Sequence, residues 1–176
     1  GIKPDVAMNE LLTQLLLRET DRRLLSESLP RIRKCLAQLS KEEIWHRPNA
    51  QTPSIGNLVL HLNGNVRQWV LSTLGGQKDT RQRQLEFDEM GPLPTSKILS
   101  DLESTLEQVR VILQHLSTDD LTRNYNVQGF TETGVSILMH VTEHFSYHVG
   151  QITYSTKSMK DIDMGYYDGQ DLDTTS

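Results

Sequence analysis

Three histidines recur at every fourth position in one segment of the chain, and histidine is a residue type that binds transition metals. His140, His144 and His148 all lie within the stretch 134–152. If this stretch is helical, side chains four residues apart lie one turn above each other on nearly the same face. Two imidazoles in that arrangement can bind one metal ion. The spacing therefore indicates half of a metal site, and the alternative is a pair of hydrogen-bonded histidines on a semi-buried face.

A helical wheel at about 100° per residue indicates which two of these histidines face the protein interior. The apolar residues of the stretch fall on one side of the wheel, and they are Ile137, Leu138, Val141, Phe145, Val149 and Ile152. From the centre of that side, His148 lies at about 40°, His144 at about 80° and His140 at about 120°. We therefore expect His144 and His148 to point inward and His140 to lean toward solvent.

A histidine pair on one helix needs a third ligand from another element. The stretch 55–74 has apolar residues at helical spacing, and His61 lies at the edge of that apolar face. An edge histidine is usually only solvated, but no other histidine outside the 134–152 stretch is placed beside a helical core face. His46 falls in an expected loop, and His115 points away from the apolar stripe of its helix. We expect neither of these two to be a ligand.

Composition places the chain among single-domain globular proteins. It has 176 residues, of which 23% are charged, and a net charge of −5. It lacks a basic stripe with interleaved aromatic residues, so no nucleic-acid partner is predicted. Its single cysteine, Cys35, rules out an internal disulfide and indicates a reducing, cytoplasmic location, with the thiol buried and inert. No apolar run approaches the length of a membrane span, so no membrane partner is predicted either.

Apolar periodicity predicts four long helices, over residues 8–39, 55–74, 95–116 and 134–157. In the first of them, two apolar runs drift apart on the wheel and Pro30 follows, which predicts a kink or a break. The segment 122–133 is expected to be extended or looped. The predicted fold class is all-α, an antiparallel four-helix bundle over residues 8–157 with a long crossover between helices 2 and 3.

The connecting and terminal segments are the least regular parts of the prediction. The charged loop 77–94 is longer than an ordinary connection, and we interpret it as a crossover, with a substrate-binding role as the alternative. Residues 158–176 form an acidic C-terminal tail, expected to be partly disordered and pinned by Tyr166 and Tyr167. Residues 1–7, before Met8, are excluded from the predicted bundle.

Several motifs together resemble those of the DinB-like (YfiT-related) superfamily, in one of its uncharacterised bacterial branches. They are the stretch Ser54–Trp69 around His61, the charged run Asp79–Arg83 with Glu86 and Phe87, and the ending His144-x-x-x-His148-x-Gly150-Gln151-Ile152. The resemblance implies an antiparallel four-helix bundle, often a homodimer. It also implies a divalent metal, commonly zinc or nickel, bound by His61, His144 and His148. Some proteins of this superfamily are transferases or isomerases that use low-molecular-weight thiols.

Three neutral imidazoles leave a coordination position for water or a thiolate, which is typical of a catalytic metal site. Gln151, one turn beyond His148, is the candidate catalytic residue, because it can orient that histidine or the bound water. The first functional hypothesis is thus a metal-dependent hydrolase or thiol transferase. The second is a metal- or small-ligand-binding module without turnover, and the third is a dimeric bundle without metal. The identity of the fourth-helix pair stays open, because His140 has the same spacing.

Overall fold

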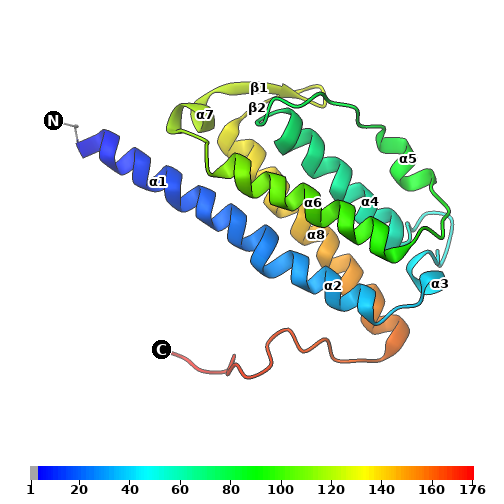
Figure 1. The fold of residues 1–176 in the computed structure, drawn as a ribbon. Coiled ribbons are helices and arrows are strands. Elements are labelled where there is room, and N and C mark those ends of the chain that lie inside the picture. The colour runs from blue at the N-terminus through cyan, green and yellow to red at the C-terminus, as the bar shows by residue number, and fades with distance from the viewer. Residues whose placement is uncertain (1–3) are drawn as a thin grey trace.

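Four long helical segments lie side by side and form the body of the protein (Figure 1). The structure is a computed structural model that describes residues 4–176. The first segment runs through α1 (Pro4–Asp21), η1 (Arg22–Ser28) and α2 (Leu29–Ala37), and the second through α4 (Ile55–Val66) and η2 (Arg67–Ser72). The third is α6 (Thr95–Leu113) and the fourth is α8 (Gly134–Lys160). The predicted all-α bundle is confirmed.

The first helical segment does not break where the sequence predicted a kink or a break. Its chain passes from α1 into α2 through η1, seven residues of π-helix. A π-helical turn holds more residues than an α-helical turn, so it rotates the side chains that follow. The second apolar run reaches the core, where Leu25 and Leu29 are both buried. The first run does not, because Leu11, Leu12 and Leu15 are 51%, 57% and 41% exposed. Pro30 lies in the first turn of α2, where a proline is tolerated.

The core lies between the four helical segments, and each of them contributes side chains that are fully buried. Ile32, Leu62, Leu102 and Phe145, one from each segment, have no more than trace exposure. Their positions follow the helical spacing of apolar residues seen in the sequence. This packing fixes the relative positions of α4 and α8, the two helices that carry the candidate metal ligands.

The crossover between η2 and α6 contains a short helix, α5 (Arg83–Asp88), which packs against α4. The side chain of Asn57, fully buried in α4, ties the two together: its amide donates to the backbone oxygens of Glu86, at 2.9 Å, and Glu89, at 2.8 Å. Arg47, from the loop after α3 (Lys41–Ile44), donates to the Asn57 oxygen at 2.8 Å. The predicted loop is therefore a crossover held closely to the bundle.

A β-hairpin precedes the fourth helix, where the sequence predicted extended or looped chain. After α7 (Thr118–Thr122), β1 (Asn124–Val127) pairs antiparallel with β2 (Phe130–Thr133). The turn residues Gln128 and Gly129 both have positive φ, 51° and 82°, as a two-residue hairpin turn of the primed type requires. Thr133 then caps α8 by accepting a hydrogen bond from the Ser136 backbone.

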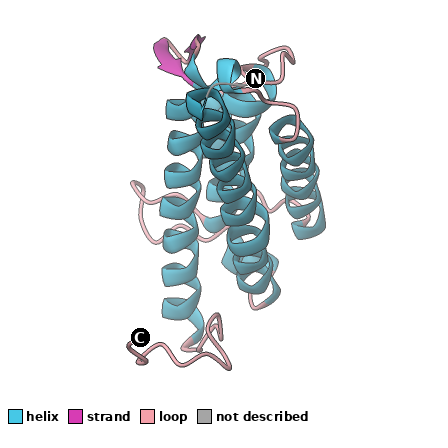
Figure 2. Ribbon diagram, turned by 90° about the vertical axis from the view of Figure 1, so that its left-hand side faces the viewer, coloured by secondary structure: helices cyan, strands magenta, loops and turns pink. Residues whose placement is uncertain are grey.

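The C-terminal segment lies at the opposite end of the bundle from the hairpin (Figure 2). Helix α8 ends at Lys160, beyond the predicted end at residue 157. The Tyr166 hydroxyl then lies 3.2 Å from the Cys35 sulfur and 2.9 Å from the Thr153 hydroxyl. Cys35 is buried, as predicted. The division into a bundle and a partly disordered tail stays a prediction.

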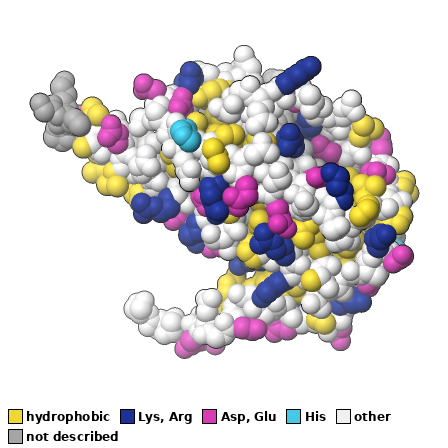
Figure 3. Space-filling view, in the orientation of Figure 1, with side chains coloured by type: hydrophobic (Ala, Val, Ile, Leu, Met, Phe, Trp, Pro, Cys, Tyr) yellow, Lys and Arg dark blue, Asp and Glu magenta, His cyan; other side chains and the backbone are white. Residues whose placement is uncertain are grey.

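At the other terminus, α1 begins at Pro4, so residues 4–7 belong to the first helix although the prediction excluded them. Residues 1–3 of that excluded segment lie outside the described residues. Within residues 4–176, no helix is long and apolar enough to cross a membrane. Figure 3 shows basic and acidic side chains interspersed over one face of the molecule, without a basic stripe on that face.

Candidate metal centre

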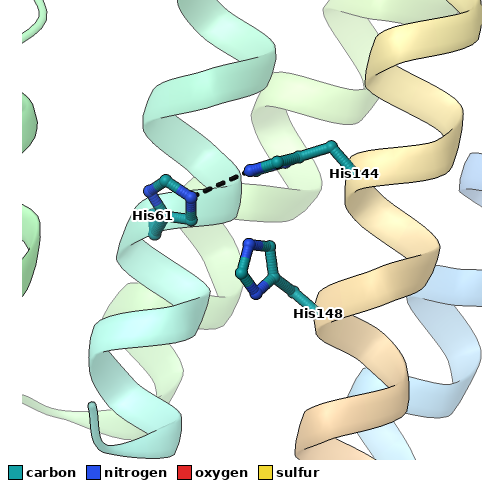
Figure 4. A group of neighbouring side chains, drawn as sticks. All are labelled: His61, His144 and His148. Atoms are coloured by element: carbon teal, nitrogen blue, oxygen red, sulfur yellow. Dashed lines mark hydrogen bonds between the residues drawn. The ribbon is translucent and has the colours of Figure 1, made fainter. Parts of the chain in front are cut away.

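The structure brings together the three histidines that the sequence and the resemblance selected. His61 projects from α4 toward His144 and His148, which lie one turn apart on α8 (Figure 4). One ring nitrogen from each histidine lies within 4.8 Å of the others, and the Nε2 atoms of His61 and His144 are 2.9 Å apart. Nitrogens that share one ion at about 2.0–2.1 Å each lie about 3–3.5 Å apart. Small side-chain adjustments therefore suffice for the three to meet at one ion.

The orientation of the His61 ring is set by a carboxylate from the crossover. Its Nδ1 lies 3.0 Å from Glu86 Oε1 and 3.3 Å from a guanidinium nitrogen of Arg81. The carboxylate is nearer and accepts hydrogen bonds, so we place the proton of the ring on Nδ1, donating to Glu86. The lone pair is then on Nε2, which faces the other histidines. Carboxylate–histidine pairs of this kind orient metal ligands and raise their basicity.

Glu86 is in turn held by Arg81 in a buried ion pair. The Arg81 side chain is 4% exposed and that of Glu86 is 10% exposed. Arg81 donates to both carboxylate oxygens, at 3.0 and 3.1 Å, and its third nitrogen donates to Gln68 at 2.8 Å. Such two-point contacts fix the carboxylate in position as well as in charge. Three residues from the crossover and α4, Arg81, Glu86 and His61, thus form one continuous hydrogen-bonded chain.

The ring of His148 is oriented by its neighbour one turn away. Its Nδ1 donates to the Gln151 side-chain oxygen at 2.7 Å, which leaves Nε2 free for a ligand. Burial lowers the pKa of His148 below its ordinary value, while the Gln151 hydrogen bond opposes this effect. Gln151 therefore contacts His148 as predicted for an orienting residue, and its catalytic role stays a prediction.

His144 differs because the described residues offer no partner for its Nδ1, which is buried. Burial and the neighbouring His148 and His61 rings lower the pKa of His144 to about 3. The ring is therefore neutral near pH 7, the form that binds metals. Because His61 Nε2 presents a lone pair 2.9 Å away, the proton of His144 lies on Nε2, which donates to His61. For Nε2 to bind a metal, that proton has to move to Nδ1.

The predicted position of His140 is wrong. The wheel placed it toward solvent, but its ring is half-buried and stacks on Trp69, with centroids 3.7 Å apart. Its Nε2 lies 3.2 Å from the Asn65 amide, and burial lowers its pKa. The wheel considered α8 alone, whereas Trp69 from η2 covers this side of α8. His140 is thus outside the cluster of ring nitrogens that the described residues form.

The other two histidines lie where the sequence placed them. His46 and His115 are both exposed, and the His115 Nδ1 contacts the Val111 backbone oxygen at 2.8 Å. His61 is more buried than an edge residue, at 4% exposure, because the crossover covers it. The contacts of Arg81 and Glu86 with His61 were not predicted. The charge of the crossover and the motif match were the signals that pointed toward them.

Comparison with known proteins agrees with the resemblance. Residues 14–166 match the sequence model of the family described as "Protein of unknown function (DUF1572)". The chain belongs to the DUF1572 family. A comparison with curated proteins found no match.

Two solved structures of DinB-like proteins are similar to this DUF1572 member in fold. A DinB-like protein from Bacillus subtilis has a TM-score of 0.60 at 18% identity, covering 80% of this chain and 91% of the other. A DinB-like protein from Bacillus cereus has a TM-score of 0.58 at 20% identity, covering 76% of this chain and 87% of the other. These similarities confirm the DinB-like fold that the motifs predicted.

One glycine of α4 makes room for the crossover carboxylate. A Cβ added at Gly64 would lie 1.9 Å from Glu86 Oε2 and 3.2 Å from Arg81 Nε. We expect Gly64→Ala to displace the carboxylate and to lower the free energy of unfolding by about 1–2 kcal/mol, although alanine favours the helix itself. Urea denaturation measures this change.

Gly150→Ala on α8 is the matched control, since nothing lies within 4 Å of an added Cβ there. It is expected to raise the free energy of unfolding by up to about 1 kcal/mol through helix propensity. If both alanine variants are stabilised equally, the close contact at Gly64 does not contribute to the free energy of unfolding.

Proposed function

We propose that the protein binds one divalent metal ion through His61, His144 and His148 and acts as a metal-dependent hydrolase or thiol transferase. One observation carries the proposal. The three imidazoles converge within 4.8 Å, and two of them donate their outer nitrogen to a fixed acceptor, Glu86 or Gln151. A histidine pair kept only for core packing needs no such orientation.

The donor set fits zinc or nickel, since neutral imidazole suits both ions. Three protein ligands leave coordination positions open, as in catalytic rather than structural zinc sites. When bound, such an ion supplies Lewis acidity to an oxygen or sulfur group of the substrate. The protein residues hold the geometry: Glu86 and Arg81 fix His61, Gln151 fixes His148, and the Phe87 ring covers His61 with centroids 4.7 Å apart.

A metal- or small-ligand-binding homodimer without turnover is the second candidate. The observation that favours it is that Glu86, the carboxylate in contact with the cluster, is already paired with Arg81 and His61. It is therefore not free to act as a general acid or base. In both candidates we place the protein in a reducing, cytoplasmic environment, consistent with an unpaired, buried Cys35.

The first experiment is elemental analysis by plasma emission of protein purified without chelator, followed by titration of the metal-free protein with zinc, nickel and cobalt. We expect about one equivalent per chain, with cobalt absorption bands of a low-coordinate nitrogen site. Addition of low-molecular-weight thiols should shift those bands if the open positions accept a thiolate. Turnover of electrophiles or hydrolysable esters would then separate an enzyme from a binder. Failure to bind any of the three ions contradicts the proposal.

A further inference from the structure

A groove runs between the C-terminal half of α8 on one side and the loop 46–53 with the first turn of α4 on the other, beside the histidine cluster. Its volume is about 630 Å³, within the range of pockets that hold small molecules. The residues that matter for its chemistry are His46, Leu58, Tyr147, Gln151, Tyr154 and Met159. It is a different space from the site at the three imidazoles, none of which lines it.

Among the described residues that line the groove, none is a lysine, arginine, aspartate or glutamate. Its walls are the apolar side chains of Leu58 and Met159 and the rings of two tyrosines. By contrast, the cavity of about 350 Å³ next to the crossover is lined by Arg67, Arg81 and other charged residues. Burying a charge without a partner is costly, so the groove disfavours an ionic ligand and suits an uncharged one.

The groove continues along the helix pair that carries the metal ligands. Leu58 precedes His61 by about one turn on α4, and Gln151 follows His148 by about one turn on α8. Tyr147 also joins the two regions, because its ring meets the His148 ring edge-on with centroids 5.0 Å apart. A ligand in the groove therefore lies against residues that contact a candidate metal ligand.

Gln151 gives the groove a polar side chain whose hydrogen-bond donors are available to a ligand. Its oxygen accepts from His148, whereas its amide N–H groups make no hydrogen bond to the described residues. Tyr147 and Tyr154 are 64% and 79% exposed, which leaves two large aromatic surfaces available for packing. Exposed aromatic rings with a polar tip are well suited to ligand contact.

We propose that this groove binds the body of a small, uncharged substrate with an aromatic or aliphatic part, next to the histidine site. Gln151 donates to an acceptor group of that molecule while its oxygen continues to orient His148. That the bound molecule is a substrate rests on the proposed function, whereas its binding requires only the groove. It assigns the substrate class as neutral and largely apolar, rather than anionic.

The test uses Nile red, an uncharged fluorophore, with the full chain in chelator and again with one equivalent of zinc. We expect saturable binding of about one probe per chain in both conditions. Ser155→Trp, which introduces a large ring into the groove lining, should weaken binding by at least about 10-fold, a loss of about 1.4 kcal/mol. Ser104→Trp, at an exposed position of α6, is the matched control and should leave binding unchanged. Circular dichroism and urea denaturation check that both variants fold.

Two outcomes overturn the proposal. The first is equal Nile red binding by the Ser155→Trp and Ser104→Trp variants. The second is Nile red binding that increases on dilution of the protein while light scattering shows an oligomer dissociating. In that case a second copy of the chain covers the groove in the oligomer. Since the probe is measured without metal, its result is separate from that of the metal titration. Binding of the probe by a protein that takes up no metal supports the groove and contradicts the proposed metal site.

Discussion

His148→Ala is expected to weaken binding of a divalent ion by more than about 100-fold. Loss of a residue that only orients a metal ligand typically costs about 10–100-fold, and this substitution removes a ligand itself. The two remaining imidazoles, His61 and His144, cannot hold the ion as tightly as three. Competition with a chromophoric chelator measures the affinity, and plasma emission measures the metal retained after purification.

Two other histidines supply the controls for this result. His115 is exposed, lies just beyond α6 and is hydrogen-bonded to the Val111 backbone, so His115→Ala should leave metal affinity unchanged. His140 stacks on Trp69 beside the cluster, and His140→Ala should also retain the ion. Metal loss in His140→Ala but not in His148→Ala would assign the ligand pair to His140 and His144. Equal affinity in all three variants would place the site elsewhere.

Glu86→Ala is expected to lower the free energy of unfolding by about 3–5 kcal/mol, because it leaves the buried Arg81 guanidinium without its carboxylate. The same change removes the acceptor for His61 Nδ1, so metal affinity should fall by a further, separate factor of about 10–100. Urea denaturation in the presence of chelator measures the stability effect alone, since bound metal would add to the apparent stability.

Glu107→Ala is the matched control for the lost charge. Glu107 pairs with Arg110 on the surface and its side chain is 63% exposed, so the change should stay within about 0.5 kcal/mol. It should not alter metal affinity. If the two alanine variants lose similar stability, the Arg81–Glu86 pair contributes no more than a surface ion pair.

Local periodicity carried most of the fold prediction. The spacing of apolar residues is a property of each helix alone, and it located all four helical segments as well as the inward faces of His144 and His148. It failed where a neighbouring element changes the surroundings. The stacking of His140 on Trp69 and the covering of His61 by the crossover depend on contacts between residues far apart in the sequence.

Local periodicity also could not predict that the first helical segment is continuous. The drift between the two apolar runs, followed by Pro30, predicted a kink or a break, whereas a π-helical stretch produces the same drift in the sequence pattern. The structure has the π-helical stretch η1. The link from Arg81 through Glu86 to His61 was unpredictable for a related reason: Glu86 follows His61 by 25 residues, and no periodic pattern relates a loop carboxylate to a helix histidine.

The carboxylate that orients His61 belongs to the crossover rather than to the bundle, so metal binding and the mobility of the crossover are coupled. A cation that binds to the His61 imidazole also favours the state in which residues 77–94 pack against α4, because Glu86 orients His61 only in that state. By thermodynamic reciprocity, a crossover held shut must strengthen cation uptake by the same factor. Amide hydrogen exchange in that stretch should therefore slow when cation is added, so that the segment reports the occupancy of a site built mostly by other helices.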